Sequence, residues 1–185
     1  MRYRLVRDVA VFGLVFQVVH FFEHGAQLGY WFLNPTEKPW LTPWAMGGRD
    51  LLAIDGTAAA GNELLHLLGN LIFMAGLIGL AVLAGQAGRA TSQNKYLHRA
   101  LSLQGLHCLE HLLLTGTYLI WGTPLGFTTL FGAVTGTFGS GLRVWAHFLL
   151  NLAATYLTGR AVWAVDRRSW LIGRTRRSAP SPMLS

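Results

Sequence analysis

Four long apolar segments constrain this sequence more than any other feature. They cover residues 9–33, 61–84, 100–121 and 143–165. Each is long enough to supply the ~20 helical residues that cross a ~30 Å hydrocarbon layer. Only 12% of the residues are charged and 52% are hydrophobic, with a mean hydropathy of +0.38. We therefore predict an all-α fold in which residues 1–170 form an integral membrane four-helix bundle.

The basic residues predict the orientation of this bundle. Of the 15 lysines and arginines, 12 lie on one side, namely before the first segment, between the second and third, and at or after the end of the fourth. The exceptions are Lys38, Arg49 and Arg143. The positive-inside rule then places both termini and the middle loop in the cytoplasm. The first segment is too long for a secretory signal peptide and lacks its cleavage site.

The net charge of +7 does not indicate a nucleic-acid partner. The basic segments lack interleaved aromatic residues, and no nucleic-acid-binding motif accompanies them. We interpret residues 171–185 as a disordered cytoplasmic tail that sets topology and contacts anionic lipid. Membrane lipid is thus the expected partner of the charged ends.

An internal repeat connects the first and third apolar segments. Residues 17–24 read "QVVHFFEH" and residues 104–111 read "QGLHCLEH", so both follow the pattern Q-x-x-H-x-x-E-H. The second and fourth segments match more weakly, as "HLLGN" at 66–70 and "HFLLN" at 147–151. The shared residues are mostly polar, whereas chance similarity between apolar helices would preserve the apolar ones. We predict two tandem helical hairpins of the same orientation, about 9–84 and 100–165, related by a pseudo-twofold axis along the membrane normal.

Polar residues of each copy share one helical face, because they follow the i, i+3 and i+4 spacing of a helix. Their positions along the segments predict one polar band in the outer half of the bundle, covered by Pro- and Trp-rich outer loops. Burying such groups in lipid is expensive and indicates a functional site. The predicted metal ligands are His20, Glu23, His24, Glu63, His66, His107, Glu110, His111 and His147. Gln17, Asn70, Gln104 and Asn151 are predicted to orient these ligands or to pack beside them.

Imidazoles together with carboxylates suit transition metals such as iron, zinc, copper or manganese. Glu63 and His66 have the Glu-x-x-His spacing of di-iron carboxylate bundles. The counterpart of Glu63 is Val144, so the predicted site is asymmetric. Glu23 and Glu110 are the predicted catalytic residues, either bridging two metals or acting as acid and base. The expected chemistry is that of an oxidoreductase with a lipid-soluble substrate or a membrane redox partner.

Other interpretations of the same residues remain open. Histidines on different helices can hold a b-type haem, which would make the protein an electron carrier. Buried His and Glu chains also serve transporters and proton relays, and an accessory membrane subunit is a further alternative. Each motif alone also fits a buried ion pair or hydrogen bonds between helices. Cys108 is the single cysteine, which excludes an internal disulfide, and His98 is predicted to be a solvated residue.

Overall fold

The computed structural model describes residues 2–34, 41–86, 94–129 and 139–177, with the side chains of 4–34, 41–86, 94–129 and 145–164. This part of the chain is all-helical, as predicted, and contains no strand. The helices are α1 (Arg2–Leu33), α2 (Pro43–Leu51), α3 (Ala58–Gln86), α4 (Lys95–Trp121) and α6 (Gly139–Arg177). The four predicted apolar segments lie within the four long helices.

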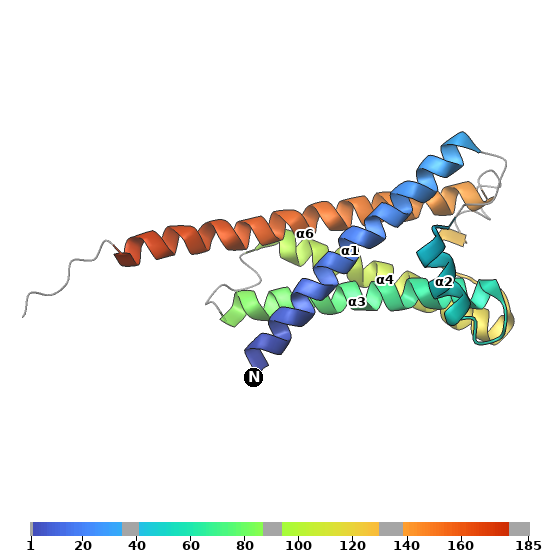
Figure 1. The fold of residues 1–185 in the computed structure, drawn as a ribbon, viewed down its shortest axis with the longest axis horizontal. Helices are drawn as coiled ribbons and strands as arrows, with labels where there is room; N and C mark the ends of the chain where they lie inside the picture. Colours follow the sequence, from blue (N-terminus) through green and yellow to red (C-terminus); the bar gives the residue numbers. More distant parts are fainter. Residues whose placement is uncertain (1, 35–40, 87–93, 130–138, 178–185) are drawn as a thin grey trace, which may run out of the picture.

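The long helices pack as a ring. Helix α1 packs against α3 and α6, and α4 packs against the same two helices. Successive long helices run in alternating directions (Figure 1). The two predicted hairpins correspond to two packed helix pairs, which we call the α1/α3 pair and the α4/α6 pair.

Glycines determine how closely the α1/α3 pair approaches. A Cβ added to Gly76 would lie 2.8 Å from Cα of Gly13, and one added to Gly79 would lie 3.1 Å from Cβ of Ala10. Small residues let two helix backbones come into direct contact. Beyond this crossing, α1 rises away from α3, and α2 lies at the same end of the molecule (Figure 1).

The apolar core lies nearer to the end of the bundle where α4 begins. It includes Phe73 and Leu77 of α3, Leu97 and Ala100 of α4, and Ala161 of α6, all at most 1% exposed. Burial of these side chains is favourable by about 25 cal/mol per Å² of apolar surface. The polar groups described below lie on the side of this core that faces the other end of the bundle.

Helix α2 is not predicted from the sequence, whose Pro- and Trp-rich composition here indicates a loop. Thr42 begins the helix, with its side chain accepting a hydrogen bond from the amide of Ala45, and Pro43 occupies the first turn. Both are typical helix-start residues. The preceding loop residues 35–40 lie outside the described part of the chain.

Helix α6 corrects a second prediction. It continues to Arg177, so residues 171–177 of the predicted disordered tail are helical. Apart from Gly173, this stretch contains no strong helix breaker, and arginines near a helix C-terminus interact favourably with the helix dipole. Residues 178–185 lie outside the described part.

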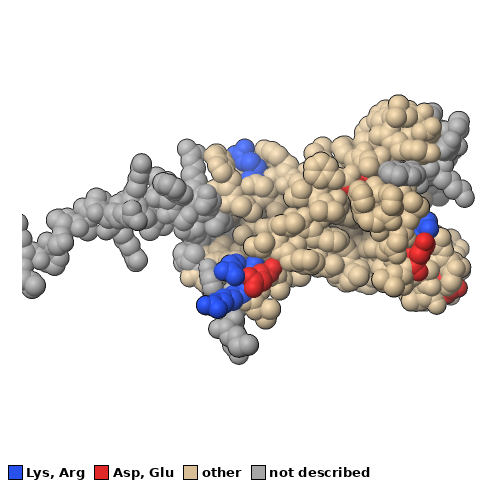
Figure 2. Space-filling model, viewed as in Figure 1, with Lys and Arg blue, Asp and Glu red and all other residues tan. Residues whose placement is uncertain are grey.

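The surface between the two ends is largely uncharged. On the face drawn in Figure 2, acidic and basic atoms gather mainly towards the two ends of the molecule. Large apolar side chains are exposed on all four long helices, including Phe22, Ile78, Leu112 and Leu149. Two helices, Arg4–Leu33 and Ala58–Gln86, are long and apolar enough to cross a membrane.

Candidate metal centre

Six imidazoles form one cluster between the four long helices. Neighbouring ring centroids are separated by between 4.6 Å, for His20 and His24, and 6.2 Å, for His20 and His66. Rings from different helices also contact one another, with His66 of α3 stacked on His111 of α4 at 5.4 Å. The members are His20 and His24 on α1, His66 on α3, His107 and His111 on α4, and His147 on α6. We call them the histidine cluster.

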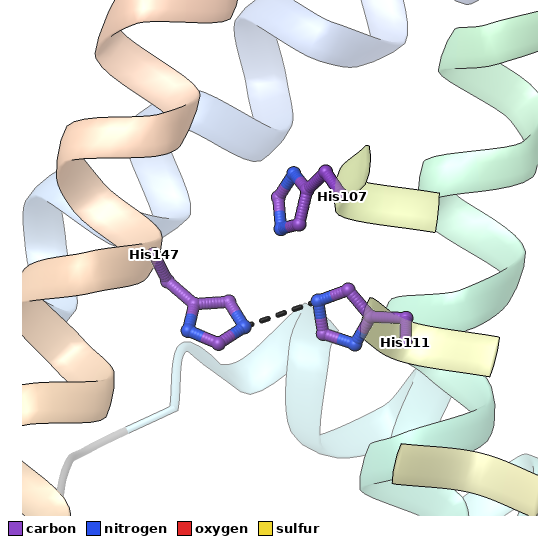
Figure 3. Close-up of side chains that lie close together, drawn as sticks. All are labelled: His107, His111 and His147. Atoms are coloured by element: carbon purple, nitrogen blue, oxygen red, sulfur yellow. Dashed lines mark hydrogen bonds between the residues drawn. The ribbon is translucent and has the colours of Figure 1, made fainter. Parts of the chain in front are cut away.

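The tightest part of the cluster belongs to the α4/α6 pair. His107, His111 and His147 are all buried, and each offers a ligand nitrogen within 4.8 Å of the other two. Figure 3 shows the three rings grouped between α4 and α6, with Nε2 of His147 3.0 Å from Nε2 of His111. Nitrogen ligands at ~2.1 Å from one tetrahedral ion lie about 3.4 Å apart. The His111–His147 spacing is therefore close to that of two ligands of one metal ion, and the ligand nitrogen of His107 lies within 4.8 Å of both.

His107 adds a second observation to this group. Its Nε2 atom is buried and has no hydrogen-bond partner among the described residues. Leaving a buried polar atom unpaired costs about 1–3 kcal/mol. A metal ion bound at this nitrogen would remove that cost.

The histidines of the α1/α3 pair are close to one another but do not converge on one point as closely. Nε2 of His20 lies 3.2 Å from Nε2 of His24. Nδ1 of His66 lies 2.7 Å from the carbonyl oxygen of Asn62 on the same helix. When a ring nitrogen donates to a backbone carbonyl, the tautomer is fixed and the opposite nitrogen becomes the available ligand.

Glutamine–asparagine pairs join neighbouring helices on the inner side of the cluster. The amide of Gln17 donates to Oδ1 of Asn151 at 3.0 Å, and that of Gln104 donates to Oδ1 of Asn70 at 2.8 Å. Each asparagine also donates to the carbonyl of the histidine one turn earlier, at 2.9 Å in both cases. These four residues therefore join the helices that carry the histidines.

The contacts of Glu23 differ from those that its predicted catalytic role would require. Its carboxylate accepts hydrogen bonds from the amide and hydroxyl of Thr42, at the start of α2, and from the side chain of Gln27. The amide of Thr42 is 3.1 Å away. Glu23 is thus engaged with the connection between α1 and α3.

Glu110 repeats this arrangement in the α4/α6 pair. It accepts from the amides of Phe127 and Thr128, at 2.6 and 3.0 Å, and from the hydroxyl of Thr128 at 2.6 Å. Gly126 makes room for the carboxylate, because an added Cβ would lie 2.7 Å from its Oε1. The geometry of both glutamates fits the anchoring of the segment that follows each helix, and the sequence did not predict these partners because they lie outside the apolar segments.

Glu63 and Gln27 complete the site. Glu63 is buried, at 3% exposed, one turn before His66 on α3. The side chain of its counterpart Val144 lies outside the described part. Gln27 was not predicted, although it is one turn after Glu23 and His24. It bridges them, with Oε1 3.1 Å from Nδ1 of His24 and Nε2 3.2 Å from Glu23.

Fold and site together define an all-helical protein with a buried imidazole cluster at the centre of its long helices. The chain belongs to the family described as "Family of unknown function (DUF6008)", whose model matches residues 1–183. No curated protein and no solved structure matches the chain.

Proposed function

We propose that this protein is an integral membrane metalloprotein whose histidine cluster binds one or two transition metal ions in the outer half of a four-span bundle. The observation that carries the proposal is the convergence of His107, His111 and His147 on one point between α4 and α6. Three imidazoles are sufficient to hold zinc, copper or iron while leaving a coordination position for a further ligand.

The surface chemistry supports the membrane location of all four long helices. Helix α4 carries four polar residues, Gln104, His107, Glu110 and His111, and all four side chains are buried. Its exposed face consists of leucines such as Leu106 and Leu109. Polar groups turned inward with an apolar outer face are expected of a membrane span. The distribution of basic residues favours cytoplasmic termini.

Matching contacts support an origin by duplication of a two-helix unit. Gln17 pairs with Asn151 as Gln104 pairs with Asn70, and Glu23 binds Thr42 as Glu110 binds Thr128. A duplicated hairpin predicts two equivalent ligand groups, His20, His24 and His66 in one and His107, His111 and His147 in the other. Among the described residues, only the second group brings three ligand nitrogens within 4.8 Å of one another, so it is the stronger candidate for an ion.

The packing around the cluster favours metal ions over haem b. A haem requires a porphyrin-wide gap beside its axial histidine. At this level the ring centroids of His24 on α1 and His147 on α6 are 5.7 Å apart, and the Gln17–Asn151 pair joins the same two helices nearby. Iron or copper bound here would suit oxidation or reduction of a lipid-soluble substrate, since both ions change oxidation state.

Metal analysis of the purified protein tests the proposal. The wild type, purified in detergent without chelator, should retain a transition metal by elemental analysis. His111→Ala should lose the ion of its group while circular dichroism shows unchanged helix content. His98→Ala is the matched control, because His98 is exposed at the start of α4. A wild-type protein without metal would overturn the proposal, and a Soret band would support the haem alternative.

A further inference from the structure

A cavity of about 210 Å³ lies between α1, α2 and α3 and reaches the histidine cluster. Its lining is almost entirely apolar, with Phe16, Val19, Trp44 and Leu65 among the walls, and His20 and His66 also border it. Val19 and Trp44 are 51% and 64% exposed, so the cavity opens at the surface of the helices.

The α1/α3 crossing explains why this space exists. The backbones touch at Gly13 and Gly76 and separate beyond that point, where α2 packs against α3 (Figure 1). Gly69 leaves room for the ring of Phe16, because an added Cβ would lie 3.3 Å from that ring. The cavity is therefore a consequence of helix geometry and small residues.

The walls fit a flat ring. Phe16 is stacked on His20, with ring centroids 5.9 Å apart and an interplanar angle of 17°. Aromatic side chains favour such offset stacking with a further ring. The volume is below the ~300–1,000 Å³ of pockets that enclose a whole drug-sized ligand. It therefore suits one ring whose attached chain remains outside.

His20 supplies the polar contact for such a ring. Its Nε2 atom is 3.2 Å from Nε2 of His24, and the residue lines the cavity. An imidazole nitrogen binds a hydroxyl or a carbonyl oxygen, depending on its tautomer. A ring that carries oxygen therefore suits a position beside His20.

We propose that the cavity binds the head group of a lipid-soluble quinone or quinol, with its isoprenoid or alkyl tail in the surrounding lipid. This inference rests on the proposed membrane location and names the substrate class for the proposed metal centre. The bound ring would lie against His20 and His66, two of the proposed ligands of the α1/α3 pair.

The binding test uses the full chain in phosphatidylcholine nanodiscs and a decyl-substituted benzoquinone as probe. Tryptophan fluorescence should be quenched saturably, and Trp44→Phe should lose most of the saturable component. Val19→Phe, which fills the cavity, should raise the dissociation constant at least tenfold. Leu106→Phe is the matched control, because Leu106 aligns with Val19 and is exposed on α4. It should leave binding unchanged.

Three results would overturn the inference. The first is quenching that partition of the probe into the lipid alone explains. The second is an unchanged affinity of Val19→Phe for the probe. The third is competition by decanol, which has the alkyl tail without the ring, at the same strength as the quinone. Metal content is measured in the same samples. Lost quinone binding with retained metal in Val19→Phe supports the cavity assignment, whereas a metal-free wild type contradicts the proposed metal centre independently of quinone binding.

Discussion

The α1/α3 and α4/α6 pairs carry the same polar side chains but differ in how openly they hold them. His107 and His147 are 2% and 4% exposed. Their counterparts His20 and His66 are only partly buried and line a cavity. The α4/α6 pair therefore encloses these imidazoles, whereas the α1/α3 pair leaves His20 and His66 accessible from the cavity.

Apolar and small residues account for this difference. Gly13 and Gly76, which form the close crossing of the first pair, align with Ala100 and Leu157 in the second. Gln27, which bridges Glu23 and His24, aligns with the fully buried Leu114. The comparison teaches that polar residues define where ligands lie, whereas side-chain volume between the helices determines what can reach them.

The largest expected effect comes from closing the crossing of the first pair. Gly76→Ala places a Cβ against the backbone of Gly13, so we expect a loss of about 3 kcal/mol in the free energy of unfolding. Gly159→Ala on α6 is the control, because no atom lies within 4 Å of its added Cβ. Thermal unfolding in detergent measures both. Equal melting temperatures would show that the crossing is looser than described.

The two glutamates should each act on their own helix pair. Replacing a carboxylate that accepts three hydrogen bonds should cost about 2 kcal/mol. Glu23→Gln should speed hydrogen exchange at the amide of Thr42, and Glu110→Gln at the amides of Phe127 and Thr128. Each variant is the other's control. If both variants instead leave exchange unchanged and abolish activity, the catalytic role predicted from sequence would be favoured.

The Gln–Asn pairs should give smaller and matching effects. Gln17→Leu and Gln104→Leu each remove an amide donor between helices, which should cost about 1 kcal/mol. Both side-chain oxygens already lack partners among the described residues, so their loss adds nothing. Chemical denaturation compares the variants. A markedly larger effect at one position would break the equivalence of the two pairs.

The smallest effect concerns the contact between the two helix pairs at Asp55, which follows α2, and Tyr118 of α4. The hydroxyl and amide of Thr57 lower the pKa of Asp55, which also accepts a hydrogen bond from Tyr118 of α4. A lowered folded-state pKa stabilises the fold above the usual Asp range and loses this effect as pH falls through that pKa. Thr57→Val should therefore raise the pKa of Asp55. The melting temperature of this variant should then fall less than that of the wild type as the pH is lowered through the acidic range. An unchanged profile would contradict this assignment.

Helical periodicity explains how much of the site could be predicted. Residues such as His20, Glu23 and His24 lie on one face at fixed spacing, so their burial follows from the pattern. The partners of the carboxylates did not follow, because Thr42 and Thr128 lie outside the four apolar segments, where the turns of the connecting chain determine position. Helix α2 depends on the local start signal at Thr42, and the cavity depends on the packing of glycines across two helices.

The Gln–Asn contacts have a consequence for biosynthesis. Gln17 finds its partner Asn151 only after 134 further residues have been made, whereas Gln104 and Asn70 are 34 apart. A buried amide without a partner is costly. Gln17 therefore stays unsatisfied, or bound to water, until α6 has been made and has packed against α1. A chain that ends before α6 would expose this amide at the open edge of an incomplete ring.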